Sequence, residues 1–320
     1  MAVLTITMLF IGTIIGAGFA TGAEIVTFFG ALPLPLWLIA LLVGVAMFAL
    51  IALSIFLYHP APNRRCKPLD CTFMILYFIM FTAMTAGVTQ LAGVGGSLLS
   101  LAVSGLIVYF GFEKMARFNT LVVISIVIVL FGICFRCLFI PVSTTVNYHH
   151  LPRGVLWAIL YAGLNCMMLP ELIAAAAPRY NKRTLLITGL VTAIIIAVFV
   201  YMILQTITVT ATADAPLPLL AGSNHPATFI VVLLAMLTSQ YTALFAIVQK
   251  INAVMPQAQK KTRTALFGSC GLAFIASFCG FNQILQWGYP LIGAFISCFL
   301  FFSCLISWWQ QRVSRRSVRH

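Results

Sequence analysis

The sequence predicts an all-α membrane protein of about ten transmembrane helices. Of its 320 residues, 62% are hydrophobic and only 7% are charged, and the mean hydropathy is +1.10. Successive stretches of about 20 residues lack ionisable groups, which matches the thickness of a hydrocarbon core. A water-soluble domain, with roughly a quarter of its residues charged, could not hide so much apolar surface. We therefore expect residues 1–320 to form one polytopic domain whose main partner is the lipid bilayer.

Ten apolar runs, separated by charged or Pro/Gly-containing connectors, are the expected helices. They extend from Val3 to Phe29, Leu34 to Tyr58, Leu69 to Ala92, Gly95 to Gly111, Asn119 to Leu138, Val155 to Ala177, Leu185 to Val209, Ala227 to Val248, Thr264 to Phe278 and Gln286 to Trp309. The fourth and ninth runs are short for a complete span. The first run lacks the basic region and cleavage pattern of a signal peptide, so we expect it to be a helix of the mature protein.

The basic residues predict how these helices cross the membrane. If the amino terminus is cytoplasmic, 16 of the 18 Lys and Arg residues fall in cytoplasmic connectors or in the tail 310–320, and Arg136 and Arg153 fall outside. An excess of Lys and Arg in cytoplasmic connectors is the usual positive-inside pattern. One missed or invented helix would move every later connector to the other side and remove this excess. We therefore predict that both termini are cytoplasmic. The net charge of +13 then reflects topology, and we expect no nucleic-acid partner.

Ten helices also allow two inverted units of five. Sliding the first helix over the sixth without gaps pairs Gly16 with Gly163 and Glu24 with Glu171. These two glutamates are the only acidic residues well inside the expected spans. The match predicts a five-plus-five inverted repeat.

Both paired helices contain residues that interrupt a helix. Glycine permits unusual backbone conformations and proline removes a hydrogen bond, so helices 1 and 6 are expected to be discontinuous. The residues concerned are Gly12, Gly16, Gly18, Gly22, Gly163, Asn165 and Pro170. Paired interrupted helices indicate a transporter site. The alternative is tight helix packing, since two of the glycine pairs have G-x-x-x-G spacing.

The segment Ile-Gly-Thr-Ile-Ile-Gly-Ala-Gly-Phe-Ala-Thr-Gly-Ala-Glu-Ile at positions 11–25 resembles the opening helix of the YkvI-like bacterial membrane proteins. Residues 161–165 and Thr238-Ser239 extend the resemblance. That family is similar to the amino acid, polyamine and organocation transporter superfamily. The resemblance implies a LeuT-like fold with repeats at about 1–139 and 151–309, located in the bacterial inner membrane. It also implies that the break at Gly16, Ala17 and Gly18 offers backbone N–H groups to a substrate carboxylate.

A carrier needs polar groups that converge at one depth of the membrane. Counting along the expected spans places Gly16, Thr82, Asn165 and Ser239 near the midpoints of their helices. Together with their neighbours, the candidate substrate-binding residues are Gly16, Ala17, Gly18, Thr82, Thr85, Gly163, Asn165 and Tyr241.

Two further groups of residues are candidates for ion coupling. The resemblance implies a sodium site at the adjacent hydroxyls of Thr238 and Ser239, and hard cations do prefer oxygen ligands. The alternative is that these hydroxyls bond to carbonyls one turn back. Glu24 and Glu171 are expected about 12 Å from the centre, toward opposite faces, as proton-coupling or gate residues. They could instead be structural acceptors that pair with a basic neighbour.

These features predict a secondary active transporter, a cation-coupled symporter of a small polar solute such as an amino acid or a related compound. Sodium or a proton is the expected coupling ion, and no other cofactor is expected. A sensor or scaffold that keeps a transporter fold is the alternative. An enzyme is not expected, because H-E-x-x-H and G-x-S-x-G motifs are absent. The lone C-x-x-C of Cys134 and Cys137 is a weak metal signal, and the oligomeric state stays open.

Overall fold

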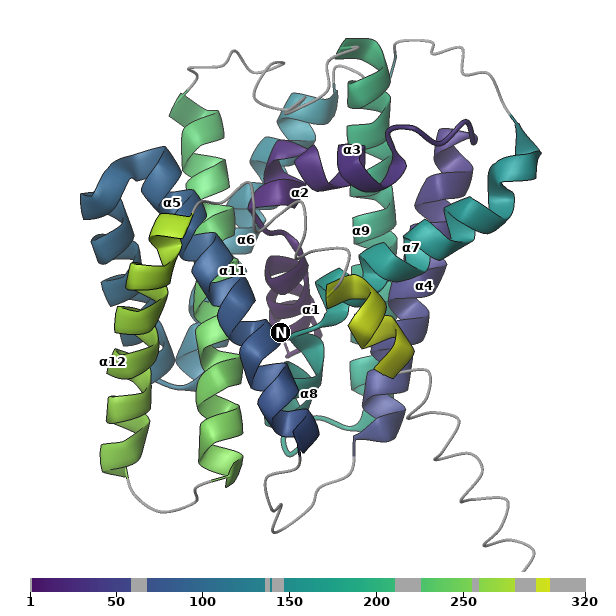
Figure 1. Ribbon diagram of the computed structural model, residues 1–320. Helices are drawn as coiled ribbons and strands as arrows, with labels where there is room; N and C mark the ends of the chain where they lie inside the picture. The colour runs from purple at the N-terminus through teal and green to yellow at the C-terminus, as the bar shows by residue number, and fades with distance from the viewer. Residues whose placement is uncertain are drawn as a thin grey trace, which may run out of the picture.

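The computed structural model describes residues 2–58, 68–135, 139, 147–210, 226–254, 259–279 and 292–299, and every regular element among them is a helix (Figure 1). In chain order these elements are α1 (Ala2–Ile14), α2 (Ala17–Thr21), α3 (Ala23–Phe29), α4 (Leu36–Leu57), α5 (Pro68–Tyr109), α6 (Phe112–Phe135), η1 (Tyr148–His150), α7 (Leu151–Cys166), α8 (Leu169–Ala176), α9 (Lys182–Thr210), α11 (Pro226–Val254), α12 (Gln259–Ala276) and η2 (Ser277–Cys279). Residues 292–299 are also helical. The predicted all-α class is confirmed.

Several of these helices can cross a membrane. Five are long and apolar enough, namely Leu36–Leu57, Asp70–Tyr109, Phe112–Phe135, Lys182–Val209 and Thr228–Asn252. The pair Tyr148–Cys166 and Leu169–Ala176, bent by 51°, makes a sixth if it is one span. Val3–Ile14 and Thr264–Ala276 are apolar but shorter. The described residues therefore form a multi-pass helical membrane protein with five or six spans by this measure.

The third and fourth predicted helices are joined in α5. Gly93 interrupts α5 with φ 71° and ψ −178°, a conformation that glycine adopts without the steric cost of a side chain. The ribbon bends sharply at the top left of Figure 1, so the second segment of α5 does not continue the line of the first.

Two observed helices extend beyond their predicted ends. α6 begins at Phe112 instead of Asn119, and α11 continues to Val254 instead of Val248. In both places the predicted run ended at charged residues, but a helix can continue past the hydrocarbon region into the polar interface. Lys250 is therefore a helical residue.

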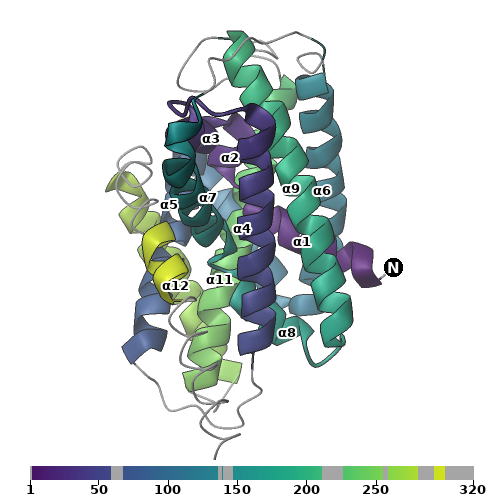
Figure 2. The ribbon, with the colours of Figure 1, turned by 90° about the vertical axis from the view of Figure 1, so that its right-hand side faces the viewer.

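Helices that are distant in the sequence pack together in pairs. α4 contacts α9, and α5 contacts α11; Figure 2 shows α4 and α9 side by side. A Cβ atom on Gly44 would lie 3.0 Å from the Cβ of Ala197, and one on Gly189 would lie 2.6 Å from Cγ2 of Ile51. Small residues therefore let α4 and α9 approach closely, as they do in many membrane proteins.

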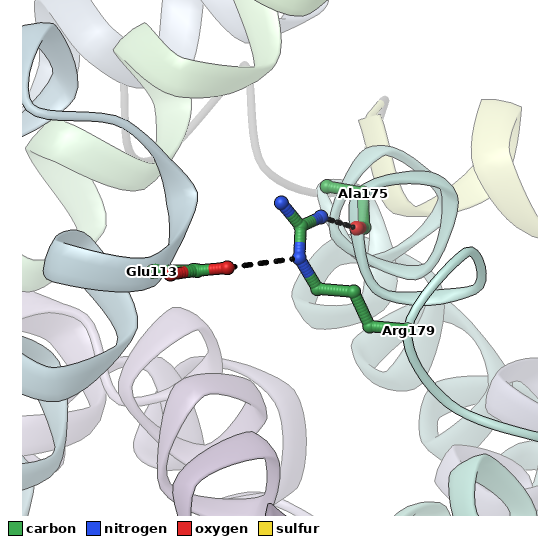
Figure 3. Close-up of polar contacts among 3 residues, drawn as sticks. All are labelled: Glu113, Ala175 and Arg179. Carbon is green, nitrogen blue, oxygen red and sulfur yellow. Dashed lines mark hydrogen bonds and ion pairs between the residues drawn. The ribbon is translucent and has the colours of Figure 1, made fainter.

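One end of the bundle gathers basic residues. The carboxyl ends of α4, α8 and α11 and the starts of α5, α9 and α12 lie in the lower part of Figure 1. Arg179, which follows α8, lies here with its Nε 3.3 Å from Oε1 of Glu113, and its Nη1 donates to the Ala175 carbonyl at 2.9 Å (Figure 3). The Arg179 and Glu113 side chains are 44% and 65% exposed, so this is a solvated surface pair. We call this end of the bundle, which also carries Lys182 and Lys250, the basic end.

Candidate functional site

A small cavity lies where the two interrupted helices meet. Its lining comes from α1 and the break after it, α3, α5, α7 and the break after it, and α11. The lining residues are Thr13, Ile14, Gly16, Glu24, Met80, Met84, Leu164, Asn165, Met168 and Ser239. The centre of a water molecule can reach about 10 Å³ of the cavity, which is room for about one water. The site is therefore nearly closed in this conformation.

The first break was predicted from glycine and is observed at Ile15 and Gly16. Gly16 is extended, with φ −91° and ψ −172°, and precedes the short helix α2. A Cβ atom on Gly16 would lie 3.3 Å from Oγ of Ser239. The missing side chain lets the backbone of the break approach the α11 hydroxyl across the cavity. Ala17 and Gly18 belong to the first turn of α2, and Gly18 is not among the residues that line the cavity.

Glu24 lies in the cavity wall and not about 12 Å away from it. That distance assumed a straight helix, but the chain turns at Gly16 and again at Gly22, where φ is 81°. α2 and α3 therefore lie across the bundle in Figure 1. The Glu24 side chain is only 4% exposed. It folds back against Gly18, where a Cβ atom would lie 2.5 Å from Oε1 of Glu24.

The second break also exists, at Met167 and Met168, between the predicted interrupting residues Asn165 and Pro170. α7 ends at Cys166, and α8 begins at Leu169 with Pro170 in its first turn, where the missing N–H of proline breaks no hydrogen bond. Asn165 lines the cavity, and its Nδ2 donates to the Tyr161 carbonyl at 3.0 Å.

Gly163 has a packing contact instead of a place in the cavity wall. A Cβ atom there would lie 2.5 Å from the Gly293 carbonyl oxygen and would overlap Ser297. Ser297 Oγ donates to the Ile159 carbonyl at 3.0 Å. Gly163 therefore lets α7 pack closely on the helix 292–299, which is the packing alternative raised for the glycines.

The adjacent hydroxyls of Thr238 and Ser239 in α11 have different surroundings. Thr238 Oγ1 donates to the Ala235 carbonyl at 2.8 Å, which is the bond one turn back described above. Ser239 is 2% exposed, lines the cavity, and its Oγ has no hydrogen-bond partner. Of the two, only Ser239 presents its oxygen to the cavity.

Three other candidate residues lie outside the cavity lining. Thr85 Oγ1 accepts from Nε2 of Gln240 at 3.0 Å and donates to the Phe81 carbonyl at 2.8 Å. The Tyr241 hydroxyl donates to Oδ1 of Asn119. Thr82 is buried, and its hydroxyl has no hydrogen-bond partner. These side chains belong to the interfaces that α5 and α6 make with α11.

Aromatic side chains close the bundle where α3 meets α7. The ring of Tyr161 lies 5.4 Å from the rings of Phe28 and Phe29, in edge-on contact with both. Trp157 makes a similar contact with Phe28 at 5.5 Å. Such edge-to-face contacts add to the burial of apolar surface. They hold α3 against α7.

The basic end contains a charge cluster that the sequence did not reveal. Lys250 Nζ lies 2.9 Å from Oδ1 of Asp70 and 2.9 Å from Oε1 of Glu171, and the three side chains are 12–14% exposed. The cluster joins α5, α8 and α11. Glu171 therefore has the basic neighbour that was one of its two predicted roles, and Asp70 is largely buried. No local sequence pattern brings these three residues together.

A metal centre is not evident in the described part of the chain, where no group of three His, Cys, Asp or Glu side chains could hold an ion. Cys134 is buried in α6, and Cys137 lies outside the described residues.

Known proteins offer one informative comparison. No family model matches the chain. The chain is 23% identical over 330 aligned residues to the uncharacterized membrane protein YkvI of Bacillus subtilis (strain 168), covering 91% of this chain and 93% of that protein. This similarity confirms the resemblance to YkvI-like membrane proteins that residues 11–25 predicted. The chain is thus a helical membrane protein homologous to one whose activity is itself unknown.

Proposed function

We propose that the chain is a secondary active transporter, not an enzyme, and that it moves a small polar solute, such as an amino acid, together with a cation. The observation that carries this proposal is the cavity between two interrupted helices. Gly16 and Glu24 reach it from the first half of the chain, and Asn165 and Ser239 reach it from the second. Discontinuous helices from both halves surround the binding sites of many secondary transporters.

Ten spans in two inverted units of five are the architecture we propose. In the first unit the spans are α1–α3, α4, the two segments of α5, and α6. In the second they are α7–α8, α9, α11, α12 and the helix that contains residues 292–299. The second elements of the two units, α4 and α9, contact each other, and so do the third elements, α5 and α11. A two-fold axis between the units would bring these pairs together.

The glycines of the first helix of each unit support the same relation. A Cβ atom on Gly12 would lie 2.6 Å from Oδ1 of Asn119, on the fifth element of its unit. Gly163 meets Ser297 on the fifth element of the other unit. Pairing Gly12 with Gly163 also aligns the ends of α1 and α7 more closely than the pairing of Gly16 with Gly163. Glu24 and Glu171 then have no equivalent positions.

The cavity is small in this conformation, with room for about one water. Phe28, Phe29 and Tyr161 join α3 to α7, and the cluster of Lys250, Asp70 and Glu171 joins α5, α8 and α11. A solute larger than water can enter only when one side opens, as alternating access requires. We place the basic end and both termini in the cytoplasm of a bacterial cell, with the protein in the inner membrane, because of the positive-inside rule.

The test combines binding with transport. The purified protein is screened by thermal shift against amino acids, because a ligand that binds at 100 times its Kd stabilises the folded state by about 2.7 kcal/mol. Each ligand found is then tested for uptake into proteoliposomes. Gly16→Leu, which fills the cavity, should abolish both signals. Gly132→Leu is the matched control, because a Cβ atom at Gly132 meets nothing within 4 Å. Binding without uptake would support the sensor or scaffold alternative.

A further inference from the structure

Two buried polar atoms of the cavity wall have no hydrogen-bond partner. They are Oε2 of Glu24 and Oγ of Ser239, whose side chains are 4% and 2% exposed. Other polar groups of the wall are satisfied locally, since Thr13 Oγ1 donates to the Leu9 carbonyl at 2.8 Å and Asn165 donates to Tyr161. Buried polar atoms usually have partners. Oε2 of Glu24 and Oγ of Ser239 lie in one cavity, where a ligand could reach both.

The charge of the cavity wall is also uncompensated. Among the described residues that line it, Glu24 is the single acid and none is Lys, Arg or His. An ionised carboxylate at this depth, with an unpaired oxygen and no basic side chain beside it in the described part of the chain, is strongly disfavoured. The closed cavity therefore selects a neutral Glu24.

The helices around Glu24 offer no neutralising partner among the described residues. α2 has no titratable side chain. α7 presents Tyr161, whose buried hydroxyl lies near Glu24, while its Arg153 is exposed. α9 carries Tyr201, and its Lys182 and Arg183 lie at the basic end. On α11, which contacts α2, Tyr241 bonds to Asn119 and Lys250 is held by two carboxylates.

We propose that Glu24 carries a proton in this closed conformation and is the group through which transport is coupled to protons instead of sodium. The proposal rests on the proposed transport function. A proton from water binds the Glu24 carboxylate when the cavity is open on one side, and it returns to water when the cavity opens on the other. No covalent bond other than this O–H bond forms or breaks.

The reason for coupling is the cost of closing around a charge. When the cavity is open, water solvates the Glu24 carboxylate, so the ionised form is stable. Closure removes that water, so the carrier closes readily only with the proton bound. Gln at position 24 would be neutral at all times. The variant should close without a proton, and its transport should lose its dependence on the proton gradient.

Infrared spectroscopy of the reconstituted protein, without any solute, tests whether Glu24 is protonated. The wild type at neutral pH should show the C=O stretch of a protonated carboxylic acid that is shielded from water. Glu24→Gln should lose this band, and Glu113→Gln should keep it, because Glu113 is exposed. A spectrum without such a band in the wild type, or a band that sodium chloride removes but potassium chloride does not, overturns the proposal.

Uptake of radiolabelled proteinogenic amino acids into proteoliposomes tests the coupling. We expect a pH gradient to drive accumulation in the wild type, and Glu24→Gln to reduce accumulation to the level without a gradient. Accumulation that needs sodium and is unchanged in Glu24→Gln overturns proton coupling. If no amino acid is transported, the proposed function fails for this class, and the infrared band alone decides whether Glu24 holds the proton.

Discussion

Two buried glutamates that look equivalent in the sequence have opposite surroundings in the structure. Glu171, at the basic end, lies 2.9 Å from Lys250, which also holds Asp70. Glu24, in the cavity, has an oxygen without any partner. Both lie in helices next to a break, and both are largely buried. The difference is that Glu171 has a cationic partner and Glu24 has none among the described residues. We therefore expect Glu171 to be a structural charge and Glu24 to need a ligand that neutralises it.

The comparison suggests that the charge cluster and Glu24 have different roles when the protein opens. The charge cluster joins α5, α8 and α11, so separating these helices at the basic end exposes three charges to water and breaks two ion pairs. On the other side, α3 is held to α7 by aromatic contacts, which carry no charge. Opening the basic end breaks the geometry of the ion pairs and changes the solvation of their charges, which opposes opening. The charge of a carboxylate such as Glu24 depends instead on whether it binds a proton. We therefore expect the basic end to set stability and Glu24 to set coupling.

The largest expected effect comes from Lys250→Met, which keeps the length of the side chain and removes its charge. It leaves Asp70 and Glu171 buried together without the charge of Lys250 between them. Removing one partner of a buried ion pair typically costs about 3 to 5 kcal/mol. The free energy of unfolding, measured by SDS titration in mixed micelles, should fall by about that amount.

Arg179→Ala is the matched control for this variant. It removes a cation from the same end of the bundle, but its pair with Glu113 is exposed and should contribute less than about 0.5 kcal/mol. Adding Asp70→Asn and Glu171→Gln to Lys250→Met should restore much of the lost stability. A loss that is the same in Lys250→Met and Arg179→Ala would show that the cluster is solvated and does not hold the basic end closed.

A smaller effect is expected for Glu171→Gln, because Lys250 keeps Asp70 as a partner. Losing one charge-assisted hydrogen bond should lower the free energy of unfolding by about 1 to 2 kcal/mol. The link between α8 and α11 is weakened, so turnover in proteoliposomes should fall more than ligand binding measured by thermal shift. If binding and stability fall together while turnover per folded molecule is unchanged, Glu171 is a structural acceptor only.

A large part of the site can be predicted from the sequence, because the depth of a residue in the membrane follows from its position along a straight helix. Gly16, Asn165 and Ser239 were placed at one depth and do line one cavity. Glu24 was misplaced because counting fails where a chain bends twice, at Gly16 and at Gly22. A glycine shows that a bend is possible, but the direction of the bend depends on packing.

The second break and the charge cluster depend even more on tertiary structure. The break lies at Met167 and Met168, residues that favour helices, and its sequence signals were the neighbours Asn165 and Pro170, whereas Gly163 serves packing. Lys250 was assigned to a connector because an apolar run was assumed to end before it. Its two partners come from helices far away in the sequence, and no local pattern identifies such contacts.

The smallest effect on stability, and the sharpest contrast with Glu171, is expected for Glu24→Gln in the acid range. If Glu24 is protonated in the closed state, Gln replaces a neutral side chain of the same size and no ion pair is lost. At a pH low enough for Glu24 to be protonated in the unfolded state as well, the free energy of unfolding should stay within about 0.5 kcal/mol of the wild type. Above the pKa of an unfolded Glu the wild type must either keep a proton that its unfolded form has lost or bury a charge, so its stability should fall relative to the variant as the pH rises toward neutral. SDS titrations of both proteins across a pH series measure this difference, and for Glu171→Gln, whose acid is paired with Lys250, the wild type should show no such fall relative to the variant. A constant difference between Glu24→Gln and the wild type at every pH would mean that Glu24 is ionised in the closed cavity and has a cation that balances it.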